Sequence, residues 1–333
     1  MSNFFVNNCL FNEWNVIEKN FDINNMPLSS KVFETSNGYI KMIGDFEEEV
    51  YFNNKVYPQG TTINGFYELD SDSYGIKDPL KNKNINVIEA KCLKIYVEDE
   101  EFNIINGVFL EYERNLDLRS GILYRHFIWE SPRGRRIEVN VKRIVSFNNK
   151  HLAAICYEVV PLNFSGEIKI ISSVKVEKDL KMVEKKSKDS FGLMVGETNN
   201  TKFKVICGVE NSVSYEGRYD FENIEKDEKI EFIYDFQAIV NKKIQLNKFI
   251  LYFTSKDFKE KDMESKLEDE LINIKRLGFF SIEKSQKNFL KRFWENFYIN
   301  TNANKTIENM VRFNEFKLLQ KYGGNYIATY RLV

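Results

Sequence analysis

The feature of this sequence that most restricts its fold is a change of hydrophobic period near residue 260. From about residue 30 to residue 255, apolar and polar side chains alternate, as in "LKIYVED" (93–99) and "RIEVNVKR" (136–143). Alternation with period two predicts antiparallel strands that bury one face. After residue 260 the apolar residues recur every three to four positions, as on an α-helix. The sequence therefore predicts a mainly β protein: a large two-sheet antiparallel β-sandwich followed by a short α-helical region.

The alternation also predicts which strand residues face the core of the sandwich. The predicted core positions are Leu93, Ile95, Val97, Ile137, Val139, Val141, Ile168, Ile170, Ile230, Phe232, Tyr234 and Phe236.

Three helices are expected after the strands. Gly278 should end the first helix, Ser281 should cap the second, Thr306 should cap the third, and Gly323–Gly324 should close the third. The apolar faces of the three helices are expected to be Met263, Leu267, Leu271 and Ile274; Ile282, Phe289, Phe293, Trp294 and Phe297; and Ile307, Met310, Val311, Phe313, Leu318 and Leu319. The last two faces are large enough to require packing on the sandwich or on a following domain. We expect a sandwich over 1–258, a helical linker over 259–324 and a tail over 325–333.

Composition excludes several classes of protein. Hydrophobic residues make up 43% of the 333 positions and aromatic residues 14%, which excludes a disordered chain. The 48 basic and 49 acidic residues leave a net charge of -1, so neither a nucleic-acid partner nor an anionic membrane is expected. No apolar run approaches a membrane span, and the N-terminus lacks the features of a signal peptide. Cys9, Cys92, Cys156 and Cys207 are widely spaced, which favours reduced thiols in a cytoplasmic protein.

Short motifs for cofactor chemistry are absent from the sequence. It contains no glycine-rich loop for phosphates or dinucleotides and no nucleophile elbow. His126 and His151 are its two histidines, and both are expected on strand faces rather than at a metal site. We therefore predict no cofactor and no metal.

Two charged runs are interpreted as surface features. "DFEEEV" (45–50) is expected to be a solvated turn, because adjacent side chains of an extended chain point to opposite faces and do not converge. "SPRGRR" (131–136) is expected to be a hairpin tip in water, with a sugar or partner contact as the alternative. Neither run is predicted to be catalytic.

Four segments together resemble a known family: "SNGYIKMIGDFEE" (36–48), "NLDLRSGILYRHFIWESPRGRRIEVNVKRIVS" (115–146), "FWENFYI" (293–299) and "MVRFNEFKLLQ" (310–320). They resemble the N-terminal half of glycoside hydrolase family 65, which contains maltose, kojibiose, nigerose and trehalose phosphorylases. The residues that match the family's strand-turn signature and its helix before the catalytic barrel are Leu116, Asp117, Arg119, Gly121, Leu123, Arg125, Arg143, Ser146, Arg312, Phe313, Phe316, Leu319 and Gln320.

This resemblance implies a galactose-mutarotase-like supersandwich and a helical linker that leads to an (α/α)₆ barrel. The family's reaction is inverting phosphorolysis, in which one glutamic acid of the barrel protonates the glycosidic oxygen while inorganic phosphate attacks. The resemblance places that glutamate and the phosphate-binding residues beyond this chain, so the chain is expected to stop before the barrel and to be inactive by itself. It also implies an α-linked glucose disaccharide as substrate, and a barrel domain or a homodimer as partner. We accordingly predict no catalytic, cofactor-binding or metal residue and assign no substrate-binding residue.

Several residues of the resembling segments carry individual expectations. Lys41 and Ile43 stand where the family usually has a Gly and an Arg, so a domain contact there would differ. Asp117 and Arg119 are expected to form a local ion pair on one strand, and Arg125 and Arg143 are expected to form salt bridges rather than to bind sugar.

Two alternatives come from other functional classes. One is a stand-alone carbohydrate-binding sandwich that uses exposed aromatic residues such as Trp129 as a stacking platform. The other is a mutarotase-like enzyme, which needs His126 or His151 in a polar cleft opposite a carboxylate.

Overall fold

The computed structural model of the 333-residue chain describes residues 4–6, 9–49, 51–52, 55–56, 60–69, 82–296 and 304–323. Phe297, Gly324 and the predicted tail over 325–333 lie outside the described residues.

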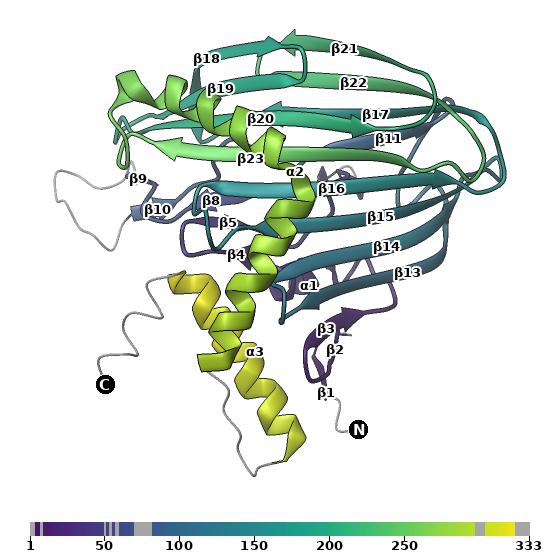
Figure 1. Ribbon diagram of the computed structural model, residues 1–333, viewed down its shortest axis with the longest axis horizontal. Helices are drawn as coiled ribbons and strands as arrows, with labels where there is room; N and C mark the ends of the chain where they lie inside the picture. Colours follow the sequence, from purple (N-terminus) through teal and green to yellow (C-terminus); the bar gives the residue numbers. More distant parts are fainter. Residues whose placement is uncertain are drawn as a thin grey trace.

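An eleven-stranded antiparallel sheet forms one layer of the molecule (Figure 1). Its strands, in spatial order, are β1 (Phe4–Val6), β2 (Cys9–Phe11), β3 (Asn15–Glu18), β13 (Val108–Asp117), β14 (Ile122–Glu130), β15 (Arg136–Val145), β16 (Leu152–Pro161), β23 (Ile244–Thr254), β20 (Lys204–Ser214), β19 (Phe191–Thr198) and β18 (Leu180–Lys188).

A five-stranded antiparallel sheet forms the second layer. Its strands, in spatial order, are β12 (Glu100–Glu101), β11 (Leu93–Val97), β17 (Gly166–Lys175), β22 (Lys229–Ala238) and β21 (Tyr219–Lys226). The register places Ile95 opposite Ile170 and Ile170 opposite Tyr234, so side chains of one parity on all three strands share a face.

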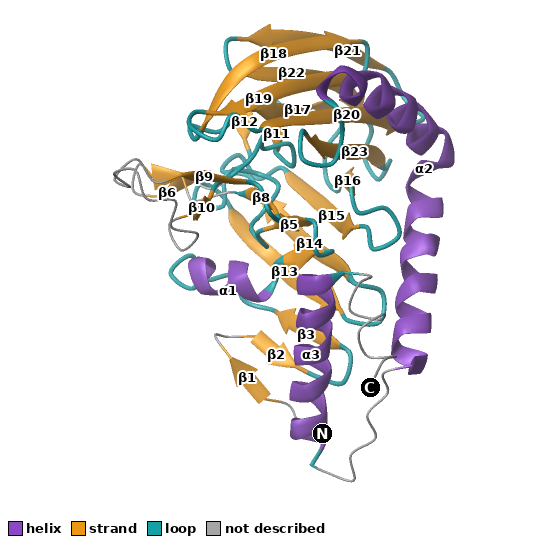
Figure 2. Cartoon of the chain, turned by 90° about the vertical axis from the view of Figure 1, so that its left-hand side faces the viewer, coloured by secondary structure: helices purple, strands orange, loops and turns teal. Residues whose placement is uncertain are grey.

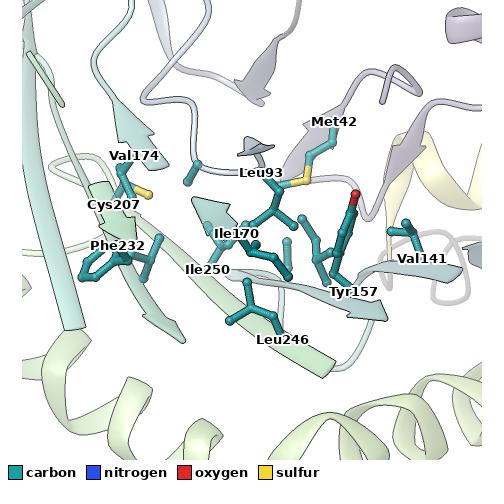
Figure 3. Close-up of a cluster of buried hydrophobic side chains, with 14 of the residues drawn as sticks. Met42, Leu93, Val141, Tyr157, Ile170, Val174, Cys207, Phe232, Leu246 and Ile250 are labelled. Atoms are coloured by element: carbon teal, nitrogen blue, oxygen red, sulfur yellow. The ribbon is translucent and has the colours of Figure 1, made fainter. Parts of the chain in front are cut away.

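The main core lies between the two sheets. All of the core positions predicted from the alternation are buried there, which confirms the two-sheet antiparallel sandwich. Figure 3 shows side chains from both layers meeting, with Leu93 and Ile170 from the smaller sheet and Tyr157, Leu246 and Ile250 from the larger.

The segment before the smaller sheet adds short elements to the same core. Strands β4 (Thr35–Ser36) and β5 (Ile40–Met42) contact β15, and β5 pairs with β8 (Thr61–Ile63). Ile40, Met42 and Ile63 are buried with the sandwich residues. The remaining elements of this segment are α1 (Met26–Val32), β6 (Tyr51–Phe52), β7 (Lys55–Val56), β9 (Tyr67–Leu69) and β10 (Asn82–Asn84).

Helix α2 (Glu260–Asn296) covers the other face of the large sheet and is broken at Gly278, where φ is 73° and ψ is 165°. The part before the break packs on β16, β20 and β23 through Met263, Leu267, Leu271 and Ile274, as the helical period predicts. Figure 2 shows the second part turning away to run down beside the large sheet. The break at Gly278 is confirmed as the end of the first helical segment.

Two predicted helix caps are wrong. Ser281 lies inside α2, where its hydroxyl donates to the carbonyl of Leu277 at 2.7 Å. Helix α3 (Lys305–Tyr322) is capped by Asn304, whose side chain accepts from the backbone N–H of Thr306 at 3.0 Å. The helix begins with the residue after Asn304, so Thr306 is already the second helical position.

The second part of α2 and helix α3 pack on the sandwich rather than standing apart from it. Leu290, Phe293, Trp294, Phe316 and Leu319 share a core with residues from the N-terminal segment and from the region of β13 to β15. The other buried members of this core are Cys9, Phe11, Val16, Phe33, Leu116, Leu118, Leu123 and Phe147. Among the described residues, none of the helices has the length and hydropathy needed to cross a membrane.

Candidate functional site

The carboxylate run at 45–49 does not form a solvated turn, so that prediction is wrong. Asp45, Glu47 and Glu48 are buried against the inner face of the large sheet, each with less than a twentieth of its surface exposed. Nη2 of Arg125 donates to Glu47 at 2.8 Å and to Glu48 at 2.5 Å. The two adjacent carboxylates therefore converge on one guanidinium, which an extended backbone would not allow.

The cations of this cluster come from neighbouring strands. Arg125 of β14 and Arg143 of β15 both point inward, and Arg143 donates to Glu47 at 2.7 Å through Nε and to the carbonyls of Ile43 and Asp45. The Tyr157 hydroxyl donates to Glu48. We call Asp45, Glu47, Glu48, Arg125 and Arg143 the buried ionic network. The predicted salt-bridge roles of Arg125 and Arg143 are confirmed.

A second buried pair extends the network. The ammonium group of Lys91 lies 3.1 Å from Asp45 and 3.2 Å from Glu89, and all three side chains are almost completely shielded from water. The sequence analysis did not single out Glu89 or Lys91. Their burial is indicated by the sequence, because both residues share one parity inside the apolar run "INVIEAKCLKIYV" (85–97).

The pKa values of the carboxylates differ because their neighbours differ. Burial raises the pKa of Asp45 to about 6, against the lowering effect of Lys91 and Arg143. Burial also acts to raise the pKa of Glu47, but Arg143 and Arg125 outweigh it and hold that pKa at about 2. Burial raises the pKa of Glu48, partly offset by Arg125. Acid–base sites also contain carboxylates whose pKa values differ in this way. Whether a substrate can reach the buried ionic network therefore decides its role.

Access to the buried ionic network is closed. The cavity beside Asp45, Glu47, Arg125 and Arg143 has a volume of about 10 Å³, at the lower limit for a single water molecule. A sugar cannot reach these carboxylates. The network therefore joins the segment 43–49 to strands β14 and β15 and acts as a structural element.

Neither histidine faces a carboxylate across a cleft. His126 lies on β14, and its Nε2 is 3.1 Å from Glu138 on the neighbouring strand β15. This strand-face position confirms the prediction for His126. His151 lies in the turn before β16, so its predicted strand-face position is wrong; its Nδ1 lies 3.0 Å from the carbonyl oxygen of Tyr252. Burial lowers the pKa of His151 to about 4. The mutarotase-like alternative has no support in this arrangement.

Trp129 is fully buried, so the proposal that it is an exposed stacking platform is wrong. It shares the inward parity of Phe127 on β14, and its ring packs against Phe102 with centroids 5.2 Å apart. The "SPRGRR" run does form the hairpin tip between β14 and β15, and Arg133 there pairs with Asp99.

The predicted ion pair between Asp117 and Arg119 is replaced by other contacts. Asp117 accepts hydrogen bonds from the Arg119 backbone N–H and the Ser120 hydroxyl, and so caps the turn after β13. The Arg119 guanidinium lies over the Trp14 ring, 4.6 Å from its centroid. β13 ends at Asp117, so the two residues do not share a strand face as predicted.

Two further observations bear on chemistry. All four cysteines are buried, and burial raises the pKa of Cys156 to about 12. Within the described part of the chain, no group of three or more His, Cys, Asp or Glu side chains is arranged to hold a metal ion.

Exposed large apolar side chains occur on α2 and α3 as well as on strands and loops. Leu277 and Phe280, at the break in α2, are 63% and 77% exposed. Ile307 and Met310 on α3 are 51% and 43% exposed. We call these four residues the helix apolar patches. Large apolar side chains with this exposure are typical of contact surfaces.

Comparison with protein families gives a match to "Glycosyl hydrolase family 65, N-terminal domain" over residues 16–293. This match covers most of the chain, including the smaller sheet, the large sheet except β1, β2 and the first residue of β3, and nearly all of α2.

Individual relatives agree with the family match. The chain is 34% identical to the α,α-trehalose phosphorylase of Thermoanaerobacter brockii, over 94% of this chain and 43% of the relative. It is 24% identical to the kojibiose phosphorylase of the same organism, over 96% of this chain and 43% of that enzyme. A solved structure titled as a putative kojibiose phosphorylase from human microbiome superposes with a TM-score of 0.83 at 18% identity, over 94% of this chain and 42% of that one. The chain thus spans less than half the length of each of these proteins.

Proposed function

Because the chain belongs to glycosyl hydrolase family 65 through that family's N-terminal domain, we propose that it is the non-catalytic portion of an α-glucoside phosphorylase. Its role is to support a catalytic domain that lies outside these 333 residues. The substrate of the assembled enzyme is an α-linked glucose disaccharide, with inorganic phosphate as co-substrate. The phosphorylases among its relatives and their greater length support this assignment.

The observation that carries the proposal is the exposure of the helix apolar patches. The inward faces of α2 and α3 already pack on the sandwich. The exposed residues Leu277, Phe280, Ile307 and Met310 are not needed for that packing. Exposed side chains of this size are expected at a surface that another domain covers. Residues 259–324 thus act as a linker that also presents the docking surface, with 1–258 as the supporting sandwich and 325–333 leading toward the barrel.

The closed ionic network supports a non-catalytic role for the sandwich. Its carboxylates are the densest in the chain, yet no substrate-sized space adjoins them. The catalytic acid of phosphorolysis then belongs to the partner domain. The four buried, widely spaced cysteines support a cytoplasmic setting.

The direct test is a phosphate assay in both reaction directions with trehalose, kojibiose, maltose and nigerose. The purified chain alone is expected to give no turnover with any of them. A mixture with the separately produced catalytic portion of the T. brockii trehalose phosphorylase is expected to form a complex in sedimentation velocity. Phosphate-dependent turnover by the chain alone would overturn the proposal.

A pair of variants tests the docking surface itself. The double change Leu277→Ser and Phe280→Ser is expected to weaken the complex while leaving the thermal unfolding midpoint unchanged. Val108→Ser is the matched control, because Val108 on β13 is 58% exposed but lies outside the helices. Equal weakening by the control would show that the helix apolar patches are not the contact.

A further inference from the structure

A pocket of about 630 Å³ lies where α3 meets the short strands β4, β5 and β8. Its volume falls within the range of small-molecule sites. The charged residues of its lining are Lys41, Lys317, Lys321 and Glu34, which is an excess of two positive charges. This excess favours an anionic ligand, because a hollow lined by one sign of charge concentrates the opposite sign.

Two glycines hold the end of α3 against the segment 34–41, which forms the opposite wall of the pocket. A Cβ atom on Gly38 would lie 2.7 Å from the backbone nitrogen of Gly323, and a Cβ atom on Gly323 would overlap the carbonyl oxygen of Asn37. Both glycines have positive φ values, 85° and 60°. A side chain at either position would push the backbones apart, so this contact fixes the lysines of α3 relative to Lys41.

Lys317 is a partly buried cation of this pocket without a carboxylate partner in the described part of the chain. Its ammonium group donates to the carbonyls of Val32 and Glu34 at 3.1 and 3.2 Å and lies 5.5 Å from the centroid of the Phe313 ring. An ammonium group has three protons, so one remains for a ligand. Burial lowers the pKa of Lys317 to about 8, and an anion beside it would offset that cost of burial.

The other two lysines differ in how far their charge is already balanced. Lys41 pairs with the carboxylate of Glu34 at 2.9 Å. Lys321 lies over the Tyr322 ring, 5.1 Å from its centroid, and has no carboxylate partner among the described residues. The negative end of the helix dipole offsets part of its charge. Lys317 and Lys321 are four positions apart and share a face of α3, so the excess positive charge is concentrated there.

Uncharged donors complete the lining of the pocket. The hydroxyl groups of Ser36 and Thr62 and the side-chain amide of Asn84 line it together with the lysines. The Ser36 hydroxyl accepts from the backbone N–H of Gly38 and keeps its own proton for donation. Phosphate oxygens accept hydrogen bonds from ammonium, hydroxyl and amide groups. A phosphate group fills only a small part of this volume, which leaves space for an organic portion attached to it.

We propose that this pocket is a non-catalytic site for a phosphate group carried by a molecule of sugar size. Lys317 and Lys321 contact the phosphate oxygens as cations. The Ser36 and Thr62 hydroxyls donate to the same oxygens, and Lys41 remains paired with the one carboxylate of the lining. The site goes beyond the supporting role proposed above, because it binds a small molecule with residues of this chain alone.

The test is isothermal titration calorimetry of the purified chain at low ionic strength, with inorganic phosphate, glucose 1-phosphate and glucose as separate probes. Both phosphate-containing probes are expected to bind more tightly than glucose. Tighter binding of glucose 1-phosphate than of inorganic phosphate identifies a phosphate ester as the ligand, and equal binding identifies free phosphate. Both results support a site for the phosphate group.

Lysine variants place that binding in the pocket. Lys317→Met, which removes the charge but keeps an unbranched side chain, is expected to weaken binding of the phosphate-containing probes about tenfold, equivalent to about 1.4 kcal/mol. Lys321→Met is expected to weaken it as well, and serves if Lys317→Met does not fold. Lys242→Met is the matched control, because Lys242 lies between β22 and β23, pairs with Glu216 and does not line the pocket.

Three outcomes would overturn the proposal. The first is no binding of either phosphate-containing probe by the unaltered chain, and the second is binding of glucose as tightly as glucose 1-phosphate. The third is equal binding by the pocket variants and by Lys242→Met. The titration needs no second protein, so failure to form a complex with a catalytic portion leaves this result readable.

Discussion

The sandwich encloses several charged side chains beside its apolar core, whereas large apolar side chains are exposed on its helices; fully buried charges are the rarer of these two features. Arg125 and Arg143 are 3% and 1% exposed at their side chains, while Phe280 is 77% exposed. These two arginines are paired with carboxylates of the segment 43–49, and the space beside them is too small for a ligand. The exposed apolar side chains on the helices leave apolar surface in contact with water.

The difference between the two regions shows where to look for function in this chain. A dense group of carboxylates with shifted pKa values suggests catalysis, but here it fastens a segment to the sheet. The surfaces open to a partner lie instead on and around the helices. Four experiments with substituted chains test this contrast, beginning with the largest expected effect.

Arg143→Met removes one of the two arginines of the buried ionic network. It removes one of the two buried arginine donors of Glu47 and the donor to two backbone carbonyls, so the free energy of unfolding should fall by about 3–5 kcal/mol. Urea denaturation measures the loss. Arg133→Met, at the exposed hairpin tip, should leave stability nearly unchanged. Equal losses in the two variants would mean that the buried ionic network does not hold the segment 43–49 in place.

Phe293→Ala and Phe280→Ala separate the two faces of α2. Phe293 is fully buried against the sandwich, and its truncation should cost about 3–4 kcal/mol. Truncation of the exposed Phe280 should change the free energy of unfolding very little. The same denaturation experiment compares them, and a large loss from Phe280→Ala would place that ring inside the fold.

The third experiment uses the buried His151 and measures how stability depends on pH. The pKa of its imidazole falls from an ordinary 6.5 to about 4 on folding, because the ring is buried. The unfolded chain therefore binds a proton between pH 6.5 and pH 4 that the folded chain excludes, and stability falls as pH falls through this window. The contribution is up to about 3 kcal/mol. As pH falls from 6.5 to 4, the stability of His151→Phe relative to the unaltered chain should rise by up to this amount. A difference between the two chains that does not change with pH would contradict this assignment.

Asn304→Ala tests the start of α3 with the smallest expected effect. Removal of the cap should lower the free energy of unfolding by about 1 kcal/mol. Thr306→Ala is the informative control, because Thr306 was the cap predicted from the sequence. A larger loss of stability from Thr306→Ala than from Asn304→Ala would identify Thr306 as the cap.

Periodicity was sufficient to predict the sandwich, its core and the helical region. The parity of Ile137, Val139 and Val141 or the helical face of Met263, Leu267 and Leu271 depends only on local backbone geometry. The same alternation also indicates that Arg125 points inward, because it shares the parity of Phe127 and Trp129. A buried arginine requires a buried carboxylate, and Trp129 at that parity could not be exposed.

Other features depend on contacts between distant segments. The bend that brings Glu47 and Glu48 together exists because Arg125, which lies 78 and 77 positions later in the chain, attracts both carboxylates. The backbone of Gly38 lies directly against that of Gly323 at the end of α3, and no local pattern indicates that approach. The helix caps differed from prediction by only two or three positions, the usual uncertainty of an element boundary.

The shared core of strand β2 and helix α3 has a consequence for synthesis of the protein. Phe11 packs edge-on against Phe313 with ring centroids 5.0 Å apart, and Arg312 donates to the carbonyl of Glu13 across 299 positions. A ribosome releases the N-terminal strands first, and contacts of such long range form slowly. The first strands of the large sheet must therefore wait, with their apolar side chains uncovered, until the segment up to Leu319 has emerged. During that interval this edge of the sheet is a natural substrate for chaperones.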